Sequence, residues 1–264
     1  MAITTLDGLI GGTKGAGLVF KTATKPAVAA GFWASYWAAG TIPAAGTLAV
    51  GNTTAGVIPT EATTGAMAFT DPSGGANSYV MGATVNSTVS GTVMLYDRVF
   101  HIGALTPTSG AYPGPVTGTT IDRPANGAGM EMWAEIVTAL SAAAHTVTIT
   151  YDDQSNVSST GSVVLAASSP IARMYPVTLD TGDSGVQHIT GISGSATPPT
   201  GTFNLMILRP IIRVGVIANV PLRLGIPETG LRPLYANSCL ALAFYNPTGT
   251  TAPDIQVSLD LTTG

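Results

Sequence analysis

The residues that most resemble catalytic machinery lie around a Gly-Asp-Ser-Gly segment at positions 182–185. Serine proteases present their nucleophile in such a turn, and His145, Asp152 or Asp153, and Ser184 follow the chain order of one Ser-His-Asp triad. His145 and Ser184 are, however, too close in sequence to come from the two barrels of that protease fold. Asp, Gly and Ser are also the residues that tight turns require. The sequence therefore predicts a turn here and no protease.

The sequence gives no better support for a metal site, a reactive thiol or a glycosidase. The three histidines have no metal-binding spacing (His101, His145 and His188). Asp180 and Asp183 lack the twelve-residue loop of a calcium site, and the single Cys239 is expected to be a buried apolar thiol. Glu131 and Glu135 would lie about 13 Å apart on one strand, too far for a glycosidase pair, and are predicted to be solvated. We expect no catalytic residue, cofactor or metal.

From residue 91 onward, apolar side chains recur at every second position. The segments 145–151 and 255–261 alternate apolar with polar residues, and 130–136 follows the same period. This alternation is typical of strands with one wet face, and turn-forming residues separate the segments. The sequence predicts an all-β protein with an antiparallel β-sandwich or jelly-roll-like domain over residues 91–264.

Residues 1–90 are rich in Ala, Gly and Thr and carry several prolines. We expect an extended, partly helical N-terminal arm here, with short helices over 4–10 and 24–40. In the second helix, Trp33, Tyr36 and Trp37 would share one face. That face would either anchor a neighbouring subunit or cover the core of the chain itself. On this division, a chain lacking residues 1–45 would still fold.

Charge is scarce throughout the chain. Only 9% of residues are charged, against about 25% in average domains, and such a surface favours association with neighbours. The net charge of −4 argues against specific nucleic-acid binding. The lysines Lys14, Lys21 and Lys25 would either contact an acidic partner or simply solubilise the arm. The uncharged stretch 26–60 is interrupted by Gly and Pro, so we expect no membrane helix.

Several longer segments of the sequence resemble virion structural proteins of tailed bacteriophages. They are "GFWASYWAAGTIP", "LYDRVFHIGAL", "DRPANGAGMEMWAEIVTAL", "HTVTITYDDQSN", "IARMYPVTLDTGDSGVQHITGISGS" and "GIPETGLRPLYANSCLALAFY". The resemblance covers most of residues 30–245 and contains no catalytic signature. It implies a non-enzymatic decoration, cement or minor capsid protein, made in the host bacterial cytoplasm and bound on the capsid surface.

The partners implied by this resemblance are the major capsid protein and further copies of the chain in a homo-oligomer. The candidate interface residues are the aromatic and basic side chains of the arm, namely Trp33, Tyr36, Trp37, Lys14, Lys21 and Lys25. The alternative is a tail-fibre or receptor-binding protein, in which a loop such as 106–120 binds a glycan. A fibre would be expected to show repeats or a coiled coil, and neither is present in the sequence. An enzyme is the third hypothesis.

Overall fold

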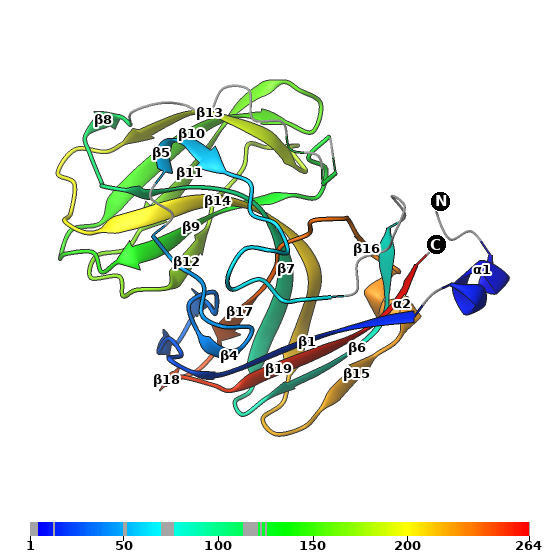
Figure 1. Ribbon diagram of the computed structural model, residues 1–264. Helices are drawn as coiled ribbons and strands as arrows, with labels where there is room; N and C mark the ends of the chain where they lie inside the picture. The colour runs from blue at the N-terminus through cyan, green and yellow to red at the C-terminus, as the bar shows by residue number, and fades with distance from the viewer. Residues whose placement is uncertain are drawn as a thin grey trace.

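The computed structural model describes residues 5–12, 14–49, 52–69, 77–112, 121, 123–124 and 126–263 (Figure 1). Strands account for 57% of the structure and helices for 3%, which confirms the all-β prediction. All strand pairs between the described strands are antiparallel.

A closed barrel forms the centre of the molecule. Its strands are paired in the order β14-β9-β12-β3-β17-β7, and a further pairing of β14 with β7 closes the ring. The barrel strands are β3 (Phe32–Ser35), β7 (Gly91–Leu105), β9 (Glu131–Thr138), β12 (Arg173–Pro176), β14 (Thr202–Val216) and β17 (Leu240–Asn246). A further strand, β5 (Asn52–Val57), pairs with the outer end of β7.

Two further sheets flank the barrel. The β1 sheet has the order β15-β6-β19-β1-β4, and β16 also pairs with β6. Its strands are β1 (Lys14–Ala23), β4 (Gly40–Ile42), β6 (Ser78–Ser87), β15 (Leu222–Leu224), β16 (Pro233–Leu234) and β19 (Ile255–Thr263). The β10 sheet has the order β11-β10-β13-β8, with β8 (Gly110–Ala111), β10 (His145–Asp153), β11 (Ser158–Leu165) and β13 (Val186–Gly194). The short strands β2 (Val28–Ala29) and β18 (Thr250–Thr251) form a separate pair.

The structure has three apolar cores, two between the barrel and its flanking sheets and one inside the barrel. One joins the β10 sheet to β9 and to one half of β7 and β14, and it includes Ile149, Ile136 and Ile207. A second joins the β1 sheet to β17 and the other half of β7 and β14. The third is made mainly of alternate residues of the barrel strands, such as Met94 and Met206, together with Trp37, Ala66 and Cys239, and it fills the barrel interior. The long strands β7 and β14 thus belong to both outer layers (Figure 1).

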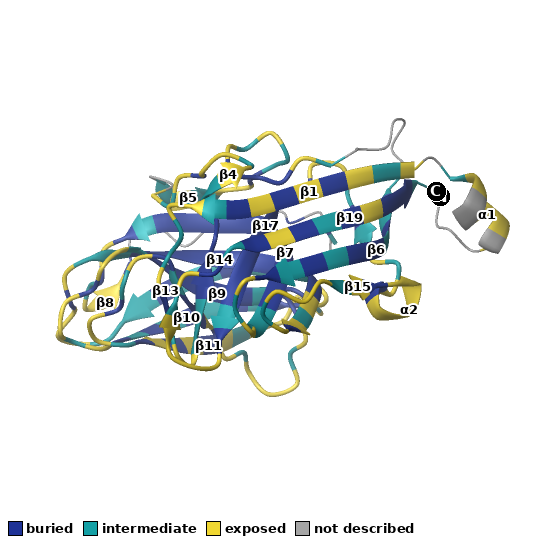
Figure 2. Cartoon of the chain, turned by 90° about the horizontal axis from the view of Figure 1, so that it is seen from below, coloured by how far each residue is buried: buried dark blue, intermediate teal, exposed yellow. Residues whose placement is uncertain are grey.

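The period-two prediction is confirmed in the outer sheets. β10 buries His145, Val147, Ile149 and Tyr151, while its threonines are partly exposed. β19 buries every second residue from Ile255, and the same alternation along its neighbour β1 is visible in Figure 2. Each segment forms a strand because one face packs on a core and the other faces outward.

The helix predicted over 24–40 is wrong. This stretch contains β2, β3 and the start of β4, and β3 lies between β12 and β17 in the barrel. The helix near the N-terminus is confirmed as α1 (Leu6–Gly11), because Thr5 caps it and accepts a hydrogen bond from Gly8 N at 3.1 Å. A second short helix, α2 (Ile226–Thr229), follows β15.

The described residues between 5 and 90 do not form a separate arm. β1 pairs with β19 from Lys14–Thr262 to Lys21–Ile255, and β6 pairs with the other edge of β19. The β1 sheet is therefore built from both ends of the chain, and a boundary at residue 90 does not separate independent units. In Figures 1 and 2, α1 projects beyond the end of the β1 sheet.

Deleting residues 1–45 is therefore expected to abolish cooperative folding, contrary to the expectation from the sequence. The deletion removes β1 and opens the barrel at β3, so buried backbone groups of β19, β12 and β17 lose their partners. Urea denaturation followed by circular dichroism checks this result. Deletion of residues 1–12, which spares both strands, is the matched control. A cooperative transition in the longer deletion would contradict the prediction.

Candidate functional site

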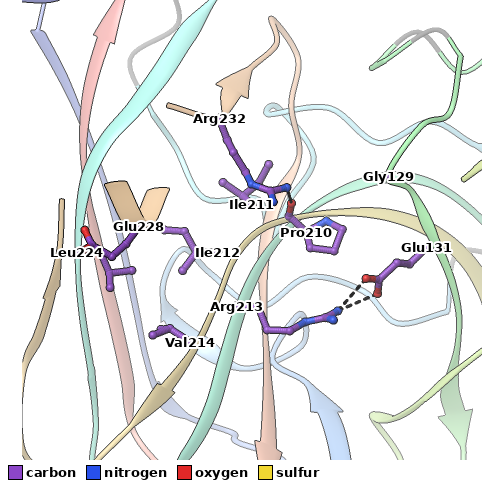
Figure 3. Close-up of a pocket in the computed structure, with 10 residues that line it drawn as sticks. All are labelled: Gly129, Glu131, Pro210, Ile211, Ile212, Arg213, Val214, Leu224, Glu228 and Arg232. Atoms are coloured by element: carbon purple, nitrogen blue, oxygen red, sulfur yellow. Dashed lines mark hydrogen bonds and ion pairs between the residues drawn. The ribbon is translucent and has the colours of Figure 1, made fainter. Parts of the chain in front are cut away.

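A groove opens between the barrel and the β1 sheet and has a volume of about 450 Å³. We call it the β14 groove. It is lined by residues 210–214 of β14, Glu131 at the start of β9, Leu224 at the end of β15, and Gly129, Glu228 and Arg232. In Figure 3, Glu131 lies on one side of the β14 residues, and Leu224 and Glu228 lie on the other. Four charged side chains of a sparsely charged chain thus meet here.

An ion pair occupies the barrel side of the groove. Arg213 Nη2 donates to Glu131 Oε1 at 3.1 Å and to Oε2 at 2.8 Å (Figure 3). Trp133 Nε1 donates to the same carboxylate at 2.8 Å. The Arg213 guanidinium also lies 5.7 Å from the ring centroid of Trp33, which packs edge-on against Trp133. Glu131 is therefore fully engaged by a cation and an indole.

The other two charges of the groove are also bound within the chain. Glu228 Oε2 accepts a hydrogen bond from Gly225 N at 2.8 Å and so caps α2. Arg232 Nη1 donates to the Pro210 carbonyl at 3.0 Å. The β14 groove consequently holds no charged group without a partner among the residues described, and its central strand residues are mostly apolar.

A second charged cluster lies inside the barrel. Arg98 donates to Glu135 through Nη1 at 3.2 Å and Nη2 at 2.7 Å, and both side chains are fully buried. Asn204 Nδ2 donates to Glu135 Oε2 at 2.9 Å and to the Leu48 carbonyl at 2.7 Å. The Arg98 guanidinium also stacks 5.0 Å from the Trp37 ring centroid. The geometry is that of a structural pair, because no solvent reaches either charge.

Burial by itself would raise the pKa of Glu135. The positive charge of Arg98, with hydrogen bonds from Arg98, Ser35 and Asn204, outweighs burial and holds the pKa of Glu135 below its usual value. Burial raises the pKa of Tyr96, which lines the same interior, to about 12. The barrel therefore contains an ionised carboxylate next to a neutral phenol at ordinary pH.

His101 is held in one neutral form by the same cluster. Arg98 Nε donates to His101 Nδ1 at 2.8 Å. Because a guanidinium can only donate, Nδ1 must carry a lone pair and the ring proton lies on Nε2. Burial, followed by the charge of Arg98, lowers the pKa of His101 to about 2. This histidine is therefore no acid or base near neutral pH.

The triad-like residues of the sequence are not brought together. His145 is buried, and its Nε2 lies 2.9 Å from the Tyr112 hydroxyl and its Nδ1 3.3 Å from Ser195 Oγ. Ser184 bonds through its backbone N–H to Gln154 Oε1 at 2.8 Å. Asp153 accepts from Ser155 N and Val157 N and so closes a turn. The predicted turn lies slightly earlier than 182–185: Asp183 N donates to Asp180 O, and Gly185 already forms a bridge with Ala128.

The aromatic interface candidates are not equally accessible. Tyr36 is buried and donates to the Pro253 carbonyl at 3.0 Å. Trp37 is buried and donates to the Thr47 carbonyl at 3.0 Å. Only Trp33 reaches the surface in part, where it packs 5.5 Å from Tyr245. The three side chains share no helix face, because Tyr36 packs in the core beneath the β1 sheet, whereas Trp33 and Trp37 pack in the barrel core.

The three lysine candidates also differ in their accessibility to solvent. Lys21 is buried and donates to the Ala39 and Pro43 carbonyls at 2.7 and 2.8 Å, and burial lowers its pKa to about 8. Lys25 forms an ion pair with Asp254. Lys14 is exposed and donates to Thr262 Oγ1 at 3.1 Å. Lys14 and Lys25 are therefore accessible to a partner, whereas Lys21 holds together the two segments on either side of β4.

An exposed apolar row lies on the outer face of the β1 sheet. Leu18 and Phe20 alternate along β1, and Ile42 of β4 lies directly beside Phe20 in the strand register. We call these three residues the β1 row. Their polar neighbours on β19 are Ser258, opposite Leu18, and Gln256, opposite Phe20. These side chains are adjacent to one another, unlike apolar residues scattered singly over a surface, so the β1 row is a candidate contact surface.

Sequence reasoning placed Glu131 and Glu135 on a solvated face, and this is wrong for Glu135. It also missed Arg213, Glu228 and Arg232. The signal for the buried pair is present, since Arg98 and Glu135 each interrupt a strongly apolar segment. The groove residues have no local signal, because they come together only through the pairing of distant strands.

Within the described part of the chain, no group of three or more His, Cys, Asp and Glu side chains is arranged to hold a metal ion. Asp183, one of the two calcium candidates, accepts instead from the Tyr151 hydroxyl at 2.6 Å. Neither described helix has the length and apolar character that crossing a membrane requires.

The fold and site together define an all-β protein with a central closed barrel, two flanking sheets and a groove along β14. No family model, curated protein or solved structure matches the chain significantly.

Proposed function

We propose that this chain is a non-enzymatic structural protein of a tailed-bacteriophage virion that binds the capsid shell as a decoration or cement protein. The sequence phrases that resemble virion proteins support the class. The β1 row, which presents Leu18, Phe20 and Ile42 to solvent, is the observation that carries the binding role. Its occupant is the major capsid protein, and burial of these side chains drives the contact.

The distribution of charge supports the same proposal. Of the ten basic side chains, Lys21, Arg98, Arg123 and Arg209 are buried. Three of those nearer the surface are paired with carboxylates (Lys25, Arg213 and Arg223). Fewer unpaired basic groups therefore reach the surface than the composition alone would allow. Such a surface suits a protein that spends its functional life against neighbouring subunits.

The proposal predicts that antibody against this chain labels the heads of intact virions from the producing lysate in immunogold electron microscopy. The double variant Phe20→Lys and Ile42→Lys is expected to lose head labelling while remaining folded, because both side chains are exposed. Val157→Lys is the control, because Val157 is an exposed apolar residue directly before β11, with an exposed fraction of 58% against 36% for Phe20 and 47% for Ile42.

Two results would contradict the proposal. Label confined to tails would favour the tail-fibre or glycan-binding alternative. The loop suggested for that role is described only up to residue 112. Absence of particle labelling would exclude a virion role and reopen the enzyme hypothesis.

A further inference from the structure

The second half of β14 has a strand neighbour on one edge only. β9 pairs with β14 from Thr202 to Leu208, whereas β7 continues along β14 to Val216. No backbone hydrogen bond among the described residues engages the other edge of residues 211–216. Alternate residues there direct their N–H and C=O groups away from β7 and into the β14 groove. This edge can accept another strand.

The β1 sheet is open on the same side. Its strand order begins at β15, which pairs with β6 but with no strand beyond it. Leu224 of β15 and Ile212 of β14 line the same groove from the two layers. The groove therefore lies where the edge of the barrel at β14 and the edge of the β1 sheet at β15 are both unpaired. The two edges share one apolar core, to which Ile211, Ile212 and Leu224 belong.

This edge lacks most of the features that protect natural edge strands from pairing. Charged side chains and prolines normally discourage strand addition. Here Pro210 and Arg232 close only one end, and the charge of Arg213 is already satisfied by Glu131. An added strand would consequently meet open backbone groups and apolar side chains, with no unpaired charge to desolvate.

The two ends of the groove complement each other. At one end, the turn from β14 to β15 exposes Ile217 and Val220. At the other end, α2 exposes Ile226 directly after β15. A two-fold axis near Arg213 would exchange these ends, so that Ile217 and Val220 of one copy cover Ile226 of the partner subunit. Such self-complementarity is the requirement of an isologous dimer.

We propose that two copies of this chain associate through their β14 edges, which pair antiparallel about a two-fold axis and cover the β14 groove. The dimer extends the β7–β14 layer across both copies and satisfies the open backbone groups. It goes beyond the proposed function, because it uses a different surface from the β1 row and requires no shell.

Analytical ultracentrifugation of the purified full-length chain tests the dimer directly. We expect a monomer–dimer equilibrium, and the double variant Ile217→Lys and Val220→Lys should weaken it at least about tenfold, because two charges would be placed against apolar surface. Val164→Lys is the matched control. Val164 is 58% exposed, against 67% for Ile217, and lies on β11 at the edge of the β10 sheet. It should leave the equilibrium unchanged.

Hydrogen exchange locates the interface without relying on a variant. Alternate amides of residues 211–216 should become protected as protein concentration rises, while those of β11 should not. A chain that stays monomeric at high concentration would overturn the proposal, and so would a dimer broken by Val164→Lys but not by the double variant. Neither result bears on virion labelling, so the two proposals fail independently.

Discussion

Replacing Glu135 with alanine is expected to lower the free energy of unfolding by about 3–5 kcal/mol, because it leaves the Arg98 charge buried without its partner. Both side chains are inaccessible to solvent, so water cannot replace the lost carboxylate. Urea denaturation monitored by tryptophan fluorescence measures the change. It is the largest effect we expect from a single substitution.

The matched control is Glu131→Ala on the same strand. Glu131 also pairs with an arginine, but side-chain exposures of 36% for Glu131 and 40% for Arg213 let water screen that pair. Its removal should cost no more than about 1 kcal/mol. The double variant Arg98→Met and Glu135→Leu should recover most of the loss, since it removes both charges together. Equal costs for Glu135→Ala and Glu131→Ala would contradict the role given to burial.

Acidification is expected to destabilise the protein through His101. The pKa of this histidine is about 2 in the folded chain, against 6.5 for an unperturbed histidine. Between these values the unfolded chain binds the proton and the folded chain does not, so stability is fully present above pH 6.5 and declines as the pH falls below it. One such group lowers the free energy of unfolding by about 2 kcal/mol between pH 7 and pH 5.

Urea titrations at a series of pH values measure this decline. Burial also lowers the pKa of His145, which adds to the decline in the same direction. The variant His101→Gln should reduce the pH dependence, whereas His188→Gln, on the partly exposed side of β13, serves as the control. A pH dependence unchanged in His101→Gln would show that the histidine titrates normally in the fold.

Local periodicity predicted much of the β structure. β10 and β19 could be read from alternation because each has one face on a core and one face outward. β9 has the same period, but its second face is also buried, since the barrel closes around it. Closure depends on the pairing of β14 with β7, which joins segments far apart in sequence, so no local pattern distinguishes a wet face from a barrel interior.

In the N-terminal segment, a local pattern was present but predicted the wrong structure, a helix over 24–40. The spacing of Trp33, Tyr36 and Trp37 fits one helix face, and Pro26 and Gly40 resemble helix ends. Pairing with β12 and β17 overrides this weak local preference and draws residues 32–35 into the barrel. The groove residues had no signal at all, because a groove between two sheets exists only after both have formed.

The pairing of β1 with β19 has a consequence for synthesis. Gly15 lies opposite Leu261, so β1 cannot pair with β19 until residues 255–262 have left the ribosome. Until then the edge of β1 that carries the Gly15–Leu261 and Leu18–Ser258 pairs has no partner, and only the end of β1 near Phe20 can pair, with β4. Such long-range pairing slows folding and exposes the chain to aggregation. Yield in the cell should therefore depend on chaperones that hold this early segment during translation.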